Sequence, residues 1–395
     1  MNILRIVYDW PEPWDGLAPA PYYLSRSQGL LGHKVTVLTG GLNGSSIKHF
    51  KFTDRPEKNV KVIKLPRALT KHTGPFLTTS PVALIVYFWE KILGNAKIVH
   101  GHGHTMLFFN IYKALFGWID KTPYIAHFHI CAKKRARLAK ERGEKFTFLQ
   151  KLFENPLHNL SDWLGVRVAD KCIVVSETSK QDFIKSYGAD PEKIVVVESG
   201  VPTNVFFPSK SKQLGFRSEL IGIGAISPRK GVNLIIEALK YLPNEYIFRW
   251  IGPEQVKGYM DELKRLAENL GVSNRVVFSG YIPNKDLPDY LRKAAVYVLP
   301  SSYEGFPKVV LEALACGLPA IVSGFRANSE IRGLYYFKSL TPKNIAKDIK
   351  DVLNSNVEVD IGKIQTQYSW DAKAREVDRV YSGVLKKPKN ENIIN

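Results

Sequence analysis

Two glutamates with seven residues between them, Glu304 and Glu312, lie in the stretch SSYEGFPKVVLEALACG at residues 301–317. The preceding VYVLPSS is typical of a strand that runs into a loop. Pro307 predicts that a helix begins there, because proline is favoured in a first helical turn. We therefore expect Glu304 in the loop and Glu312 about two turns into the helix.

The backbone between these glutamates is expected to bind an anion. The N–H groups of Gly305 and Phe306 lie near the predicted helix N-terminus, where unpaired N–H groups and the helix dipole favour negative charge. A carboxylate, an anion site and a second carboxylate suit a molecule with hydroxyls at both ends and a phosphate between, as in a nucleotide-sugar. Glu312 would then bind the ribose and Glu304 the sugar. Solvated glutamates on an ordinary amphipathic helix are the simpler alternative.

Basic residues in a second segment could balance the phosphate charge. Lys230, in SPRKGV, precedes a predicted helix at 231–242. Its ammonium could neutralise the charge that grows on a leaving diphosphate, where preorganised electrostatics matters most. Arg229 and Lys308 could add positive charge. The alternative for Lys230 is a solvated lysine at a helix start.

A glycine near the N-terminus is a further candidate for ligand contact. Gly16, in WDGLAPAP, follows the first predicted strand and precedes a helix. Without a side chain, it lets the backbone approach a phosphate or a sugar closely. The adjacent Asp15 carboxylate could face an acceptor hydroxyl.

The histidines raise the question of a metal site. His100, His102 and His104 alternate with single residues in HGHGH, so a metal site is conceivable. No carboxylate or cysteine cluster accompanies them, and the intervening glycines favour a turn at a strand end. We therefore predict no metal.

The elements that must hold these residues alternate between strand and helix along the chain. Continuous apolar runs indicate strands covered on both faces, at residues 2–8, 33–40, 60–66, 96–102, 123–130, 171–177, 193–200, 220–227, 246–252, 274–280, 295–301, 318–324 and 333–339. Helical spacing is clear at 22–32, 231–242, 260–271 and 308–317, and helices are also expected at 341–355 and 368–387.

This alternation predicts an α/β protein of two doubly wound domains. The pattern breaks near VPTNVFFPSKSKQLGF, so we expect domains at 1–205 and 206–368, a terminal helix at 369–388 and a polar tail at 389–395. Ligands of such sheets bind beyond the carboxyl ends of the strands. The glutamate and lysine segments both lie at predicted strand ends, facing a cleft between the domains.

Composition narrows the classes of function. The 395 residues are 45% hydrophobic and 11% aromatic, which excludes a disordered chain. Three widely spaced cysteines and the absence of a signal-like N-terminal segment favour a cytoplasmic protein. The net charge of +19 calls for an anionic partner, and nucleic acid, an anionic membrane or a phosphorylated small molecule would each fit. No nucleic-acid-binding motif is present, so nucleic acid is not expected.

Several of these segments together resemble the GT-B retaining glycosyltransferases of family 4. EGFPKVVLEALACGLPAIVSG resembles the family signature, GAISPRKGVNLIIEAL its phosphate-binding turn, and YSWDAKAREVDRVY its terminal crossover helix. The resemblance implies two Rossmann-like domains and a C-terminal helix that crosses back to the N-terminal domain. It also implies sugar transfer from a UDP- or GDP-sugar with retention of configuration and without a metal cofactor.

The resemblance also assigns roles to residues. It makes Lys230 and Glu304 catalytic, together with His129 near the donor sugar, and the leaving phosphate itself accepts the acceptor's proton. Glu330 matches a family glutamate near the cleft. The chain departs from the family at Asp15, where the first glycine of a pair is usual, and at Ala225, where an arginine is usual.

The acceptor is expected to be a glycan, a lipid-linked molecule or a small molecule bound by the N-terminal domain. Residues 133–153 are predicted to form a basic amphipathic helix, and apolar runs occur at 81–89 and 105–118. Together they suggest contact with an anionic membrane, at its inner face. The alternative is that the two apolar runs are buried helices.

The sequence is also compatible with other functions. A sugar-nucleotide epimerase or a phosphorylase could use the same architecture. Ala225 leaves open a nucleotide-sugar-binding protein with little or no transferase activity. A basic nucleic-acid- or membrane-binding protein is the alternative from a different class.

Overall fold

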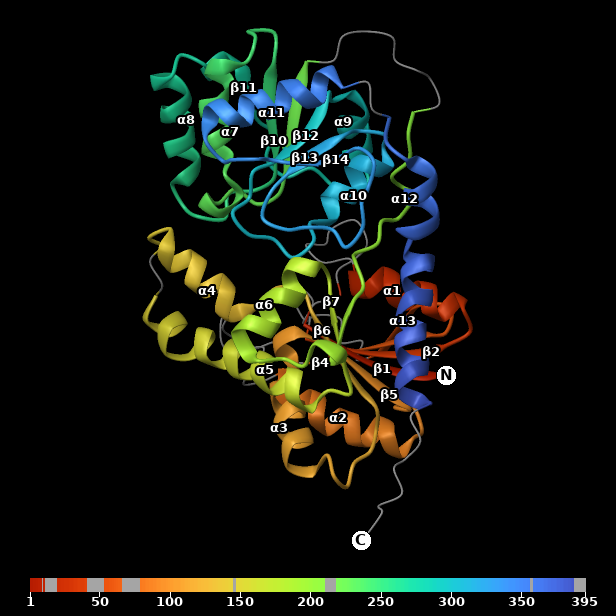
Figure 1. Cartoon of the computed structure of the whole chain (residues 1–395). Helices are drawn as coiled ribbons and strands as arrows, with labels where there is room; N and C mark the ends of the chain where they lie inside the picture. The colour runs from red at the N-terminus through yellow and green to blue at the C-terminus, as the bar shows by residue number, and fades with distance from the viewer. Residues whose placement is uncertain are drawn as a thin grey trace.

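The computed structural model describes residues 1–8, 10, 20–40, 53–65, 79–144, 147–209, 218–355 and 358–386. Within these ranges the chain forms two α/β units, one above the other in Figure 1, each built around a largely parallel sheet. Among the described helices, none combines the length and the apolar character that crossing a bilayer requires.

The N-terminal unit contains an eight-stranded sheet in the order β3-β4-β2-β1-β5-β6-β7-β8 within the described ranges. Its strands are β1 Asn2–Val7, β2 Lys34–Gly40, β3 Thr53–Glu57, β4 Val60–Leu65, β5 Ile98–His102, β6 Tyr124–Phe128, β7 Lys171–Val174 and β8 Ile194–Val196. The strands pair in parallel except for β3, which is antiparallel to β4.

Both faces of this sheet are covered, because successive side chains of a strand point to opposite sides. In β1, Leu4 and Ile6 belong to one apolar cluster, and Ile3 and Val7 belong to another. The first cluster includes residues of α2 Ser80–Ile92, α3 Leu107–Phe116, α5 Asn155–Val168 and α6 Glu177–Tyr187, whereas α1 Ala20–Leu30 and α13 Trp370–Leu385 contribute to the second. Helix α4, Ala132–Glu141, lies beside α5.

The C-terminal unit contains a six-stranded parallel sheet in the order β11-β10-β9-β12-β13-β14 within the described ranges. Its strands are β9 Glu219–Ile223, β10 Ile247–Ile251, β11 Val276–Phe278, β12 Val296–Leu299, β13 Ala320–Val322 and β14 Leu334–Tyr336. Its helices are α7 Val232–Ala238, α8 Tyr259–Asn269, α9 Leu287–Lys293, α10 Lys308–Ala315, α11 Pro342–Asn354 and α12 Ile361–Gln367.

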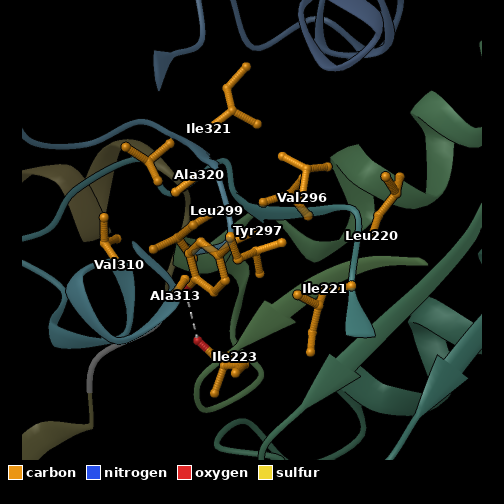
Figure 2. Close-up of a cluster of buried hydrophobic side chains, with 14 of the residues drawn as sticks. Leu220, Ile221, Ile223, Val296, Tyr297, Leu299, Val310, Ala313, Ala320 and Ile321 are labelled. Atoms are coloured by element: carbon orange, nitrogen blue, oxygen red, sulfur yellow. Dashed lines mark hydrogen bonds between the residues drawn. The ribbon is translucent and has the colours of Figure 1, made fainter. Parts of the chain in front are cut away.

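The core of the C-terminal unit holds the strand ends that carry the glutamate and lysine segments. Figure 2 shows side chains of β9, β12 and β13 packed with Val310 and Ala313 of α10. Tyr297 is fully buried in this core, and its hydroxyl donates to the Ile223 carbonyl at 3.4 Å. This contact ties the last residue of β9 to β12, so the loops after the two strands start from a fixed position.

The chain passes between the units at two places that lie side by side. The Val201 N–H donates to the Tyr368 carbonyl at 2.8 Å, and Val201 forms an isolated parallel bridge with Ser369. Beyond this point α13 runs along the N-terminal unit beside α1 (Figure 1). Asp378 of α13 accepts from Gln28 at 2.7 Å and pairs with His33 at 2.8 Å. The predicted return of the terminal helix to the N-terminal unit is confirmed.

The units also touch at their facing ends. The Tyr303 hydroxyl accepts a hydrogen bond from the Cys131 N–H at 3.3 Å, and Arg142 donates to the Ser302 hydroxyl at 2.9 Å. Gly305 lies so close to the other unit that a Cβ there would be 2.0 Å from the His129 carbonyl oxygen. A side chain at position 305 therefore does not fit this arrangement.

The prediction of one basic helix over 133–153 is wrong. Helix α4 ends at Glu141, and Gly143 adopts a left-handed conformation with φ of 75°, which glycine tolerates best. Helical structure is present again by Gln150–Glu154 (η3), a π-helical turn that leads into α5. The apolar runs at 81–89 and 105–118 do form α2 and α3, but both helices leave large apolar side chains exposed. The short strand β3 was not predicted.

Candidate active site

The Lys230 segment follows β9 and forms a tight turn. Gly224 and Gly231 have φ values of 144° and 67°, which a glycine adopts readily, and a short 3₁₀ turn over Pro228–Lys230 lies between them. A Cβ at Gly231 would lie 2.4 Å from the Pro300 carbonyl oxygen, so this turn packs against the end of β12. The Glu304 loop begins at the same strand end.

Three groups converge on one oxygen of Glu304. Its Oε1 accepts from Lys230 Nζ at 2.7 Å, from Arg229 Nη1 at 2.5 Å and from the Ser301 hydroxyl at 2.8 Å. Burial alone would raise the pKa of Glu304, but the charges of Lys230 and Arg229 outweigh it and lower that pKa. Burial lowers the pKa of Lys230, against the opposing effect of Glu304. The other carboxylate oxygen, Oε2, is not among these contacts.

Lys308 and Glu312 lie one turn apart on α10, and both side chains line the same cavity as Glu304. Glu312 is almost fully buried, and burial raises the pKa of its carboxyl group despite the nearby Lys308 ammonium. Burial lowers the pKa of Lys308. Glu312 lies one turn into the helix, not two as expected, because α10 begins only at Lys308.

A cavity of about 430 Å³ brings the predicted residues together beyond the carboxyl ends of the C-terminal sheet. Its lining includes the predicted Arg229, Lys230, Glu304, Phe306, Lys308 and Glu312. Gly305 is not part of this lining and instead faces His129 of the other unit. Ala225 also lines the cavity, where its small side chain contributes no charge.

Sequence reasoning missed one wall of the cavity. Gln255, Tyr281 and Asn284 complete its lining with polar groups. They follow β10 and β11, so the rule that ligands bind beyond strand carboxyl ends could have identified them. Their own side chains are uncharged, so they did not draw attention in the sequence as the glutamates and lysines did.

His129 lies on the other side of the interdomain contact. It lines a second cavity, of about 280 Å³, in the N-terminal unit. Its Nε2 lies 3.2 Å from His102 Nδ1. Burial and the Lys308 charge lower the pKa of His129 to about 4, so the imidazole is neutral at neutral pH. A neutral imidazole can exchange a hydrogen bond with a hydroxyl.

The second cavity also contains a buried carboxyl group. Asp162 accepts from the Ala132 N–H at 3.0 Å and from the Tyr187 hydroxyl at 3.3 Å. Burial raises its pKa to about 7, although these hydrogen bonds and Arg135 oppose the rise. Arg135 lines the same cavity. Nothing in the sequence around Asp162 indicated this position.

Among the described residues, ring nitrogens of His100, His102 and His127 lie within 4.8 Å of one another and could together approach a metal. Burial lowers the pKa of each imidazole well below 6.5. Arg5 lies 3.5 Å from His100 Nδ1, and its positive charge opposes a second cation. His100 Nε2 is also 3.1 Å from His127 Nδ1. This group belongs to β5 and β6, not to the cavity of Glu304.

Two further predicted positions, Gly16 and Glu330, complete the comparison with the sequence. Gly16 and its neighbour Asp15 lie outside the described residues. Glu330 is exposed on the loop after β13, and its carbonyl oxygen accepts from Lys363.

The sequence matches two family descriptions that together span most of the chain. Residues 14–205 match "Glycosyltransferase Family 4", and residues 208–377 match "Glycosyl transferases group 1". D-inositol 3-phosphate glycosyltransferase of Mycobacterium tuberculosis is 30% identical over 244 residues, which are 58% of this chain and 49% of that protein. The chain thus spans about half the length of this relative.

Solved structures share the whole architecture at low sequence identity. Sucrose-phosphate synthase from Thermosynechococcus elongatus superposes with a TM-score of 0.74 at 17% identity, covering 97% of this chain and 98% of that one. Anabaena HepE in complex with UDP-glucose superposes with a TM-score of 0.67 at 16% identity, covering 96% and 99%. The protein therefore belongs to the group 1, family 4 glycosyltransferases and has their GT-B fold.

Proposed function

We propose that this protein transfers a hexose from a UDP- or GDP-sugar to an acceptor hydroxyl, with retention of configuration and without a metal cofactor. The observation that carries the proposal is the convergence of Arg229, Lys230 and Ser301 on one oxygen of Glu304. It occurs in a cavity whose lining also includes Glu312. The array of cations and carboxylates suits a diphosphate between two polyols.

The donor would lie along the cavity with its diphosphate beside Arg229 and Lys230. Glu312 would bind the ribose hydroxyls, and the second carboxylate oxygen of Glu304, Oε2, would bind sugar hydroxyls. Phe306 and Lys308 line the same cavity at the start of α10, whose N-terminal N–H groups favour an anion. The UDP-glucose complex of Anabaena HepE, which shares the fold, supports a nucleotide-sugar donor.

The reaction would take place on one face of the sugar. The bond from the anomeric carbon to the diphosphate oxygen breaks, and the acceptor oxygen forms its bond to the same face of that carbon. The acceptor proton passes to the departing phosphate oxygen. Lys230 and Arg229 stabilise the charge on this leaving group, as fixed cations in a buried site do most effectively. Glu304 holds both the cations and the sugar in position.

Two observations support phosphate neutralisation by side chains instead of by a metal ion. Arg229, Lys230 and Lys308 all line the cavity, so its positive charge is supplied by the protein. Among the described lining residues the carboxylates are Glu304 and Glu312, and Glu304 is already paired with two cations. A divalent ion would have to compete with those cations for its ligands.

The acceptor would enter through the second cavity, beside His129. This cavity is in the N-terminal unit, and the contact between Gly305 and the His129 carbonyl joins the two sides. The neutral His129 imidazole could bind a hydroxyl of the transferred sugar. The proposed acceptor is a glycan, a lipid-linked molecule or a small molecule. All three cysteines are unpaired and buried, which supports a reducing compartment such as the cytoplasm.

A panel of UDP-, GDP- and ADP-sugars in a thermal-shift assay tests the donor site first. We expect one donor to raise the melting temperature equally in EDTA and in Mg²⁺, and to raise it much less in Glu312→Gln. Nuclear magnetic resonance of the product would then establish the anomeric configuration. A donor shift that requires Mg²⁺, or an inverted product, would contradict the proposal.

A further inference from the structure

The N-terminal unit exposes large apolar side chains on neighbouring helices. On α2, Ile85, Trp89 and Ile92 are 68%, 63% and 80% exposed. Just after α3, Trp118 and Ile119 are 72% and 62% exposed. Single exposed apolar residues need no explanation, but several large ones on neighbouring helices indicate a surface that meets something apolar.

Helix α2 is apolar on two opposite faces. Ala83 and Tyr87 point into the core beneath the sheet, and Tyr87 is fully buried. Ile85, Trp89 and Ile92 are spaced four and three residues apart, so they share the outward face. A helix that needed only to cover the sheet would carry polar residues there. Covering the sheet therefore does not explain the apolar residues on the outward face of α2.

The apolar surface continues along the helical layer, because α2 packs beside α3 and α3 packs beside α5. Near the start of α5, Phe148 and Leu152 are 74% and 51% exposed. On α5 itself Trp163 is 42% exposed, and the Arg167 guanidinium lies 4.1 Å from its ring centroid. Exposed tryptophans and phenylalanines with cations nearby are typical of a surface at a bilayer interface.

The charges around this surface are mostly positive. Exposed basic residues on α4, α5 and the adjoining segments include Lys121, Lys133, Arg137, Lys140, Lys151 and Arg167. Among the described residues, Glu90 of α2 and Asp120 are buried and paired, with Lys61 at 3.0 Å and with Lys91 at 2.6 Å, whereas exposed Glu141 on α4 pairs with Arg137 at 3.4 Å. The net field at this surface therefore attracts anions.

We propose that the outward face of α2, α3 and α5 docks on the surface of an anionic lipid bilayer. Trp89, Ile92 and Trp118 would enter the boundary between headgroups and acyl chains, and the basic residues would contact the headgroup phosphates. A second copy of the chain is the competing occupant. It is disfavoured because two such surfaces would bring like charges together.

Two helices, α4 and α5, contribute both to the acceptor cavity and to the exposed surface. Helix α5 contributes His158 and Asp162 to the cavity lining, while Trp163 of the same helix is exposed. Helix α4 likewise contributes Arg135 to the lining and exposes Arg137 and Lys140. If the proposed transfer holds, a bilayer that contacts α4 and α5 would lie close to the cavity that binds a lipid-linked acceptor. This last step rests on the proposed function, whereas the docking does not.

Sedimentation with vesicles tests the docking without any activity assay. The full chain is mixed with phosphatidylcholine vesicles or with vesicles that also contain phosphatidylglycerol, at low and at high salt. We expect binding to the anionic vesicles that weakens with salt, and a blue shift of tryptophan fluorescence on binding. Trp89→Glu with Ile92→Glu should weaken the partition by about tenfold or more. Arg137→Glu with Lys140→Glu should also weaken it at low salt.

A matched control places the same charges on the other unit. Tyr241→Glu with Val256→Glu changes residues of the C-terminal unit that are 47% and 45% exposed, and it should leave the partition unchanged. Equal binding by wild type and the α2 variant would overturn the proposal. So would a dimer in sedimentation velocity without vesicles that Trp89→Glu with Ile92→Glu converts to monomer. Thermal shifts with donor, measured without lipid, test the proposed transfer separately, so a failure of the docking can be distinguished from a failure of the proposed function.

Discussion

Glu304 places a single carboxylate oxygen between two cations and a hydroxyl, in a position with little access to water. The two cations are thereby held side by side through one shared oxygen. The arrangement has a cost, because burial lowers the pKa of Lys230 and so disfavours its charge. An incoming diphosphate would relieve that cost by adding negative charge beside the ammonium.

Lys230→Ala should therefore reduce transfer far more than it reduces folding. We expect kcat to fall by about 10²–10³-fold, the loss typical when one preorganised charge-stabilising group is removed. The rate at which nucleotide is released from the donor in the presence of acceptor measures this fall in kcat. Lys240→Ala changes an exposed lysine of the same unit and serves as the control. A fall of less than about threefold in Lys230→Ala would contradict the assigned role.

Asp162 makes a separate prediction about pH. Its pKa is about 7 in the folded protein and near 4 when unfolded, so the folded state retains a proton that the unfolded state loses. Its contribution to stability is therefore present at low pH and is lost as the pH rises from about 4 to about 7. Asp162→Asn keeps an oxygen for the Ala132 N–H and the Tyr187 hydroxyl but cannot ionise.

As the pH rises, the free energy of unfolding of Asp162→Asn should increase relative to that of the wild type. At about 1.4 kcal/mol per pKa unit, the gain between acid and neutral pH is at most on the order of 4 kcal/mol. Urea unfolding of both proteins across this range measures the difference. Parallel stability curves for the two proteins would show that Asp162 does not titrate in this way. Asp261→Asn, on exposed α8, is the control.

At the level of secondary structure, the network beneath α13 joins elements that are distant in sequence. Arg5 of β1 is fully buried and donates to Ser25, to Gln28 at 2.5 Å and to the Tyr381 hydroxyl at 3.3 Å. Tyr381 of α13 also bonds His100 Nδ1 on β5. These contacts fix α13 on the sheet by polar groups as well as by apolar packing.

Tyr381→Phe should destabilise the protein by about 1–3 kcal/mol, because it leaves buried polar partners without their hydrogen bonds. Chemical unfolding monitored by far-ultraviolet circular dichroism measures this change. Tyr241→Phe alters a half-exposed tyrosine of the C-terminal unit and should change the free energy of unfolding by less than about 0.5 kcal/mol. Equal values for the two variants would contradict a structural role for the Tyr381 hydroxyl.

The sequence predicts the elements well where apolar periodicity decides them. The thirteen predicted strands are all confirmed, because strands buried on both faces leave continuous apolar runs. The prediction of one helix over 133–153 was wrong because the periodic charges continue past Gly143, where a left-handed backbone ends the regular helix. For the apolar run at 81–89 the sequence left membrane contact and a buried helix both open, since an apolar run does not show which of its sides faces solvent.

The predictions for the site depended on where the charges lie. Glu304, Glu312, Arg229 and Lys230 were predicted because charged residues beside glycine and proline stand out in the sequence. Asp162 was not, because its raised pKa arises from burial between α4 and α5, which only the fold creates. Gly305 was expected to bind an anion, whereas the structure brings it against the other unit, and that contact depends on how the two units meet.

For the whole molecule, the approach of the two units depends on position 305. Gly305→Ala would place a Cβ 2.0 Å from a backbone oxygen, which cannot turn aside as a side chain could. We expect the units to separate and the transfer rate to fall by about tenfold or more. Donor affinity should change little, because the residues lining the donor cavity belong to the C-terminal unit.

Small-angle scattering and donor titration distinguish these two effects of Gly305→Ala. The matched control is Gly383→Ala, since a Cβ at that helical position meets nothing within 4 Å. The control should keep full activity and gain up to about 1 kcal/mol in stability. Loss of donor affinity equal to the loss of rate in Gly305→Ala would instead indicate damage within the C-terminal unit.

The paired crossing at Val201 and Tyr368 has a consequence for how such proteins diversify. The residues that line the cavity of Glu304 and Glu312 all lie between those two positions, in one continuous stretch of the sequence whose ends meet in space. Recombination at two neighbouring points could replace that piece with the corresponding piece from a relative while the remaining part of the chain keeps its contacts. A lineage could thus acquire a new donor in one genetic event and keep its acceptor.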